Sequence, residues 1–308
     1  MKITDKRKVN IMKWIIKQQH EGMLLRDYIR QVQGVSRRIL KAIKFEGGLI
    51  LVNNVEQSVR YVLKEGDEVE ITLPIEKKGN FMVPGEVPLS IIYEDKDIIV
   101  LDKQAGVAVL PSYHYPTGTI ANGLLAHYEQ QNSASTVHIV TRLDKDTSGL
   151  MLVAKHRYSH SVLSTSQQAG ELKRKYQAII AGALSKTSGT IDAPIGRKED
   201  SIIEREIRED GKRAITHYHV ECNLTDCSFV TVQLETGRTH QIRVHFSSIG
   251  HPLYGDSLYG GDVSVIQRQA LHCYALTFPH PITKQTLCFS VDLPFDMVNA
   301  LRKLKTSL

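Results

Sequence analysis

The chain of 308 residues contains only four cysteines: Cys222, Cys227, Cys273 and Cys288. No two of them have Cys-x-x-Cys spacing, which argues against a zinc site. We expect free thiols in a reducing compartment. The N-terminus is polar and has no signal-peptide-like segment, and no apolar run approaches the roughly 20 residues that span a bilayer. These absences predict a soluble, cytoplasmic protein that does not bind membranes.

The sequence also lacks a glycine-rich phosphate loop, a dinucleotide-binding fingerprint and an internal repeat. Its charge, however, is unevenly distributed. Residues 1–44 hold twelve Lys and Arg against three Asp and Glu, whereas the rest of the chain holds 27 against 30. A basic N-terminal unit on a near-neutral body is typical of a polyanion-binding module attached to another domain. A solvated basic face is the alternative interpretation.

The basic unit has the pattern of two helices. Apolar residues recur at helical spacing over residues 24–32. Ser36 is a candidate N-cap for a second helix over residues 37–44. On this second helix, Arg37, Lys41 and Lys44 form a basic stripe that is separate from the apolar face.

Short strands should follow at residues 49–52, 61–63 and 69–73, with Asn53-Asn54 as the turn between the first two. Residues 13–74 resemble the alpha-L RNA-binding module, through Ser36-Arg37-Arg38, the segment from Gly48 to Asn53, and Gly66-Asp67. The resemblance implies contacts to the RNA phosphate backbone from Arg37, Arg38 and Lys41. A small solvated helix pair is the alternative.

A longer body follows a stretch that is rich in turn-forming residues, including Lys77-Lys78-Gly79-Asn80. Residues 91–93 and 98–101 are typical of a β-hairpin, and later segments mix helix and strand patterns without regular alternation. This favours an α+β fold over a doubly wound one. We expect a small N-terminal α/β RNA-binding module over residues 1–75, a linker at 76–88 and a larger domain over 89–308.

One polar, turn-rich segment, residues 140–149, leads into a strand that has the pattern of a buried one. Loops held by rigid strands commonly carry catalytic side chains. The residues alone allow three interpretations of Asp144 and Asp146: a catalytic carboxylate pair, a metal site, or turn and N-cap residues. The turn interpretation is the default.

A second polar cluster follows the strand-like segment 230–234. Arg238, His240 and Gln241 bring several hydrogen-bond donors together, and such a cluster could bind any anion. Metal binding by the histidines of this region is disfavoured, because no acidic partner shares a helical face with them. We therefore expect no metal.

Together the two segments resemble the RluA family of pseudouridine synthases. The matching motifs are Arg-Leu-Asp-Lys-Asp-Thr-Ser-Gly at residues 142–149 and Gly-Arg-Thr-His-Gln-Ile-Arg-Val-His at 237–245. Further matches lie at 103–106, 174–178 and 271–281, so that the resemblance extends from about residue 91 to 293. The related RsuA family usually has Thr-Glu-Gly at positions 147–149 and lacks the Thr239-His240 pair.

Two positions depart from the family pattern. Thr141 stands where many members have histidine, and Gln104 stands where the usual residue is proline. We expect the first to alter packing or substrate preference beside the loop, and the second to loosen a turn. Neither removes a catalytic group.

The resemblance implies a pseudouridine synthase fold with a mixed, mostly antiparallel central sheet. It also implies an isomerase that needs no cofactor and acts on specific uridines in structured RNA. Asp144 would be the catalytic carboxylate, either attacking the sugar or acting as a base on the ribose. Arg238 would pair with Asp144 and favour its ionised form, and Tyr176 would stack on the uracil.

The target uridine would have to flip out of the RNA helix to reach Asp144. Arg142 matches the family arginine that would fill the vacated space. His240 and Gln241 would make further RNA contacts. The first expectation for the target is ribosomal RNA and the second is tRNA, and we expect a monomer with no obligate protein partner.

Three other functions are compatible with parts of the pattern. A non-catalytic RNA-binding scaffold could retain the same fold. A metal-dependent nuclease or phosphatase could use Asp144 and Asp146. A glycosidase would need a second carboxylate, for which Glu235 is the candidate near the motifs.

The N-terminal module leads to a test. Replacing Arg37 and Arg38 together by Glu should weaken RNA binding, because phosphate contacts are lost, and should leave the catalytic site intact. The slope of log affinity against log salt should fall by about 0.9 for each phosphate contact removed. Filter binding across a salt series measures both quantities. An unchanged affinity and slope would exclude RNA binding by this face.

Overall fold

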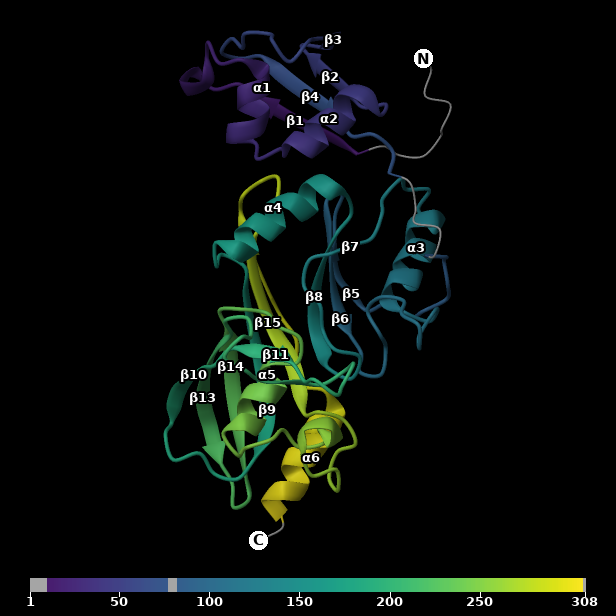
Figure 1. Ribbon diagram of the computed structural model, residues 1–308. Coiled ribbons are helices and arrows are strands. Elements are labelled where there is room, and N and C mark those ends of the chain that lie inside the picture. Colours follow the sequence, from purple (N-terminus) through teal and green to yellow (C-terminus); the bar gives the residue numbers. More distant parts are fainter. Residues whose placement is uncertain (1–9, 77–81, 307–308) are drawn as a thin grey trace.

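The computed structural model describes residues 10–76 and 82–306, so the expected linker residues Lys77-Lys78-Gly79-Asn80 lie outside the described residues. Two β-sheets with separate apolar cores make up most of the molecule. The small N-terminal sheet lies at one end, helix α4 (Arg157–Gln168) lies between it and the large sheet, and α6 (Phe295–Thr306) lies at the opposite end (Figure 1). The predicted α+β class is confirmed.

The N-terminal sheet is antiparallel, with strand order β1-β4-β2-β3. Its strands are β1 (Ile11–Ile15), β2 (Leu49–Val52), β3 (Val55–Glu56) and β4 (Glu68–Thr72). Its helices are a 3₁₀ turn at Gln18–His20, α1 (Leu25–Asp27), which continues as a π-helical turn at Tyr28–Val32, and α2 (Arg37–Phe45). The two predicted helices are therefore present, the first with a wider last turn.

Local chemistry explains the second helix. The Ser36 hydroxyl accepts the Ile39 N–H at 3.2 Å, which confirms the predicted N-cap. The apolar face of α2 is buried, whereas Arg37, Lys41 and Lys44 of the basic stripe and the neighbouring Arg38 are exposed. The basic stripe therefore faces solvent.

The predicted strand at residues 61–63 is wrong. Val62 forms only an isolated bridge with Leu24. The Asn53-Asn54 turn does exist, with both residues at positive φ, 51° and 64°, but it joins β2 to the two-residue strand β3. Paired asparagines at positive φ favour such a tight hairpin turn, so the next strand begins directly after it, at Val55, and not at residue 61.

The large sheet has strand order β10-β13-β14-β9-β15-β8-β6-β5, with β16 beside β15 and β7 beside β8. Among the described strands only β15 and β8 pair in parallel, which confirms the mixed, mostly antiparallel sheet. The strand bounds are β5 (Ile91–Glu94), β6 (Ile98–Lys103), β7 (His138–Ile139), β8 (Ser148–Ala154), β9 (Lys173–Ala181), β10 (Ser188–Asp192), β13 (Ile215–Asn223), β14 (Cys227–Leu234), β15 (Leu271–Pro279) and β16 (Thr286–Ser290).

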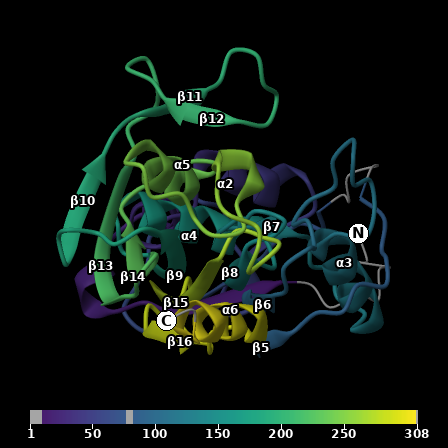
Figure 2. The same cartoon turned by 90° about the horizontal axis from the view of Figure 1, so that it is seen from below.

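Helices α3 (Ile120–Gln130) and α5 (Gln241–Ser248) pack on this sheet, and a short 3₁₀ turn follows at Ser257–Tyr259. A separate hairpin of β11 (Ile195–Arg197) and β12 (Arg205–Ile207) projects from the body (Figure 2). No helix within residues 10–76 and 82–306 is long and apolar enough to cross a membrane. Every residue of β8 is buried, because sheet neighbours lie on both edges of β8 and other elements cover both of its faces.

One tyrosine joins the two halves of the molecule. Tyr158 belongs to α4, yet it is fully buried within the N-terminal core. Its hydroxyl donates to the Gln33 carbonyl at 2.6 Å, and its ring contacts that of Trp14 edge-on. Tyr158 therefore contributes an apolar contact and one hydrogen bond between the module and the body.

This contact can be tested by substitution. Tyr158→Ala should lower the free energy of unfolding by about 3–5 kcal/mol, because it opens a cavity where the two halves meet. Tyr158→Phe keeps the ring and should cost about 1 kcal/mol. Urea denaturation measures both values. A loss below about 1 kcal/mol for the alanine variant would contradict the role given to this ring.

Candidate active site

The loop between β7 and β8 holds Asp144 close to the start of β8, a central strand of the large sheet. Leu143 is buried beside it and anchors the loop in the core. The Lys103 ammonium donates to the Lys145 carbonyl at 2.7 Å and also to the carbonyls of Gln104 and Val107. Burial lowers the pKa of Lys103 to about 8. Lys103 therefore fixes the backbone directly after Asp144.

The position after the loop must be glycine, because the backbone of Gly149 lies very close to the backbone of Cys273. Gly149 has φ 108°, and a Cβ there would lie 2.3 Å from the Cys273 carbonyl oxygen. This is where β8 runs parallel to β15. Any side chain at this position would separate the two central strands that support the loop.

The guanidinium that contacts Asp144 belongs to Arg243, and this corrects the expected pairing with Arg238. Arg243 Nη1 lies 3.3 Å from Asp144 Oδ2. Arg243 also donates two hydrogen bonds to the Asp256 carboxylate, from Nε at 2.6 Å and from Nη2 at 2.7 Å. Burial lowers the pKa of Arg243, but the hydrogen bonds and charge of Asp256 outweigh it and the net shift is upward. Arg243 is a permanent cation held in a fixed orientation.

The expected partner, Arg238, is exposed and turned elsewhere. Its Nε donates to the Arg213 carbonyl at 2.9 Å. The position of α5 is the physical reason: Arg243 is the third residue of that helix, whereas Arg238 lies in the preceding turn. Arg238 still lines the cavity described below, at its rim.

His240 is the N-cap of α5 and has φ 57°, in the left-handed region. Its Nδ1 lies 2.8 Å from the Tyr259 hydroxyl, which also accepts the Arg205 N–H. This arrangement favours the tautomer with the proton on Nε2, which lies 3.8 Å from Asp144. Burial lowers the pKa of His240, opposed by the charge of Asp144. His240 therefore lies beside the Asp144 carboxylate, a position that the sequence did not suggest.

Asp144 opens onto a cavity of about 190 Å³. Tyr176 of β9 forms part of its wall and is buried, and burial raises the pKa of its hydroxyl. Among the described residues that line the cavity, Asp144 is the only carboxylate. The cavity therefore offers one acid, one tyrosine and several cations.

The other predicted RNA contacts differ in accessibility. Arg142 is exposed and donates to the Thr239 hydroxyl at 3.3 Å, so that it lies at the rim. Gln241 is buried, and its amide bonds are used within the protein. Its oxygen accepts the Arg238 N–H and the Thr236 hydroxyl, and its nitrogen donates to Ile215 and Thr216. Gln241 therefore stabilises the loop, which corrects its expected RNA contact.

The second carboxylate that each alternative enzyme would need does not line the cavity in the described structure. Glu235, the glycosidase candidate, accepts a hydrogen bond from His217 at 2.8 Å and does not line the cavity in the described structure. Asp146 is likewise absent from its described lining. A glycosidase with two carboxylates and a two-aspartate metal site both lack their second group here.

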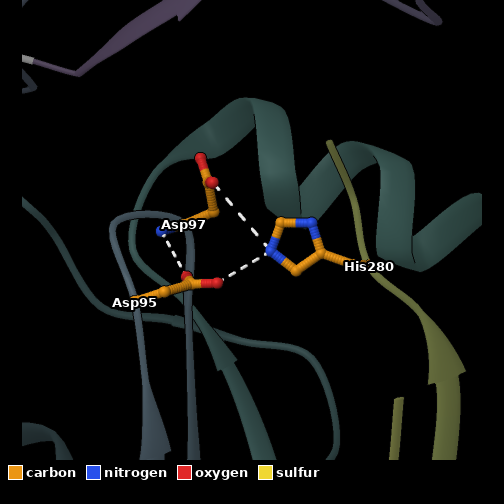
Figure 3. Close-up of side chains that lie close together, drawn as sticks. All are labelled: Asp95, Asp97 and His280. Carbon is orange, nitrogen blue, oxygen red and sulfur yellow. Dashed lines mark hydrogen bonds and ion pairs between the residues drawn. The ribbon is translucent and has the colours of Figure 1, made fainter. Parts of the chain in front are cut away.

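A separate cluster deserves comparison with a metal site. Asp95, Asp97 and His280 each place a ligand atom within 4.8 Å of the others (Figure 3). However, His280 Nδ1 accepts the backbone N–H groups of Ile282 and Thr283, so the ring proton lies on Nε2, which donates to Asp95 at 2.8 Å. A ring in this tautomer has no free lone pair for a cation. The cluster instead joins the end of β15 to the β5–β6 turn.

Comparison with known proteins agrees with this geometry. Residues 97–248 match the family model described as RNA pseudouridylate synthase. The uncharacterized RNA pseudouridine synthase YjbO of Bacillus subtilis is 49% identical over 280 residues, which cover 91% of this chain and 99% of that protein. The chain belongs to the RluA family of RNA pseudouridine synthases.

A second relative of this synthase is ribosomal large subunit pseudouridine synthase D of Vibrio parahaemolyticus. It is 38% identical over 285 residues, with 87% of each chain covered. The structure of human RNA pseudouridylate synthase domain containing 1 has a TM-score of 0.56 and 28% identity, and the match covers 70% of this chain and 87% of that one. The synthase is therefore an isomerase whose substrate is RNA, and the scaffold alternative is not supported.

The two departures from the family pattern have structural explanations. The Thr141 hydroxyl is buried and accepts the Leu152 N–H at 2.8 Å, so it fixes the loop to β8. Gln104 is exposed, and its carbonyl accepts the Lys103 ammonium. A proline at position 104 would retain that carbonyl.

The Arg243 pairing gives a direct test in this synthase. Arg243→Gln should slow single-turnover pseudouridine formation by about 10²–10³-fold, because Asp144 loses its partner. It should also lower the free energy of unfolding by about 3–5 kcal/mol, because Asp256 stays buried without its cation.

Arg238→Gln is the matched comparison, since it removes a neighbouring arginine and leaves the Asp144–Arg243 pair in place. Its rate loss should be smaller and its stability close to that of the wild type. An equal or larger rate loss for Arg238→Gln would show that the arginines exchange roles when RNA binds.

Proposed function

We propose that this synthase isomerises a specific uridine of ribosomal RNA, with Asp144 as the catalytic carboxylate. The observation that carries the proposal is the ion pair between Asp144 and Arg243, at 3.3 Å, at the wall of a cavity of about 190 Å³. This cavity has room for one flipped base and not for an RNA helix. Tyr176, buried in the same wall, is positioned to stack on the uracil.

The chemistry requires no group from outside the chain. Asp144 either attacks the sugar carbon or removes a proton from the ribose, and both routes begin with the carboxylate next to the flipped nucleotide. Arg243 fixes the orientation of that carboxylate. Arg142 at the rim is positioned to enter the RNA helix where the uridine has left it.

Ribosomal RNA is proposed for two reasons. Relatives with a named substrate, such as the Vibrio parahaemolyticus protein, are ribosomal large subunit synthases. The N-terminal module over residues 1–75 also exposes a basic face with Arg37, Arg38 and Lys41, which suits RNA phosphates. tRNA is the second candidate. We further propose a cytoplasmic monomer, because one chain carries Asp144, Arg243 and Tyr176 together.

The test is to incubate the purified synthase with unmodified ribosomal RNA and tRNA transcripts, with Asp144→Asn in parallel. Pseudouridine is mapped by carbodiimide labelling and primer extension. We expect a new stop at one uridine of ribosomal RNA with the wild type. We expect none with Asp144→Asn, which retains its RNA affinity because the substitution is nearly isosteric.

The outcomes separate the parts of the proposal. A stop only on tRNA would replace the target and keep the site. A stop that persists with Asp144→Asn would exclude Asp144 as the catalytic carboxylate.

A further inference from the structure

Arg174 lies in the wall of the cavity and plays no part in the contacts described so far. It belongs to β9 and is only 7% exposed. Its Nε is fully enclosed and has no hydrogen-bond partner in the described part of the chain. Asp144, the only described carboxylate in the cavity lining, is taken by Arg243. A buried guanidinium whose Nε has no hydrogen-bond partner is costly to the free protein, so its retention needs an explanation.

The strand directs Arg174 toward the substrate. Side chains two residues apart on a strand share a face, so Arg174 and Tyr176 both face the cavity, whereas Lys175 between them is exposed. Tyr176 is the residue proposed to stack on the uracil. Arg174 therefore lies two residues along β9 from the tyrosine proposed to bind the base, on the same face of the strand.

The Arg174 guanidinium occupies the space where a side chain at position 237 would lie. A Cβ on Gly237 would lie 2.7 Å from Nη2 and 3.2 Å from Nη1 of Arg174. The backbone of Gly237 is not in the left-handed region, so its conformation does not demand glycine. The absence of a side chain at position 237 is explained by the space that Arg174 needs.

The depth of Arg174 indicates which part of the RNA it meets. Arg142 and Arg238 are exposed at the rim, where the phosphates of a flipped nucleotide remain. Arg174 is enclosed, and the group of a flipped nucleotide that enters deepest is the base. Uracil presents two carbonyl oxygens, which accept hydrogen bonds from a guanidinium.

We propose that Arg174 binds a carbonyl oxygen of the flipped uracil and stabilises the negative charge that the base carries during the reaction. When the C1′–N1 bond breaks, its electron pair stays on the uracil and spreads over N1 and the carbonyl oxygens. The charge is consumed when C5 bonds to C1′, and the proton on C5 is exchanged for one on N1. A cation fixed beforehand where this charge develops accelerates the step. This inference rests on the proposed site around Asp144.

The experiment uses full-length protein and an RNA fragment that the wild type converts. Arg174→Met removes the charge and keeps much of the apolar stem, and Lys175→Met is the matched control from the other face of the same strand. We expect Arg174→Met to lower the single-turnover rate at saturating RNA by about 10²–10³-fold. RNA affinity and its salt slope should change little, and the unfolding midpoint in urea should be equal to or above that of the wild type. Lys175→Met should retain the wild-type rate.

Several results would overturn the proposal. A rate within threefold of the wild type would remove Arg174 from the reaction. Weaker RNA binding with a salt slope reduced by about one unit would assign Arg174 to a phosphate. A lower unfolding midpoint would assign it a structural role. Full rates for both Arg174→Met and Asp144→Asn would instead indicate failure of the proposed site.

A second variant tests the geometry without removing the charge. Gly237→Ala should displace the guanidinium and slow the reaction in the wild-type background. In the Arg174→Met background the same substitution should have no further effect, because nothing remains to be displaced. Losses that multiply in the double variant would show that Gly237 acts independently of Arg174.

Discussion

The active site depends on one buried guanidinium. Arg243 uses its Nε and Nη2 for Asp256 and turns Nη1 toward Asp144. The planar fork of arginine fixes these directions relative to each other, which an ammonium group could not do. Asp256 lies in the loop after α5, whereas Asp144 lies in the loop before β8. Arg243 therefore sets the distance between two segments that are more than 100 residues apart in sequence.

The two motifs predicted that Asp144 is paired with an arginine, but they did not indicate which arginine faces it. Arg238 and Arg243 lie in one short motif, and both are plausible partners for a carboxylate. The choice depends on where α5 begins, and its N-cap His240 has a left-handed backbone, with φ 57°. Non-glycine residues rarely adopt that conformation, so no local pattern predicts it. Apolar residues also alternate in the sequence at Ile242, Val244 and Phe246, which is a pattern typical of a strand. The segment is nevertheless the helix α5, which is buried on nearly every side.

The fold was predictable where a segment carries its own signal. Ser36 caps α2 through the nearby Ile39 N–H, and the asparagine pair marks a turn because asparagine tolerates the positive φ that this turn requires. The contact between the two halves carries no such signal. Tyr158 has the pattern of an ordinary helix residue, and its place in the N-terminal core is set by the docking of two domains. Arg174 is a similar case: alternation on β9 indicates its face, but only the tertiary structure shows that its Nε has no partner.

The cavity lining combines four arginines with one carboxylate, which is an unfavourable balance for the free protein. The four are not equivalent. Arg243 is neutralised by aspartates, and Arg142 and Arg238 are exposed to water. Arg174 is buried, and its Nε has no hydrogen-bond partner in the described part of the chain. Solvent lowers the cost of the rim charges and salt screens them, so they suit phosphates, which any RNA provides. The enclosed charge is screened far less, so it distinguishes strongly between an empty cavity and one that holds an anionic base. On the proposed role of Arg174, the stability that the free protein loses by holding this charge is regained when the uridine enters the cavity.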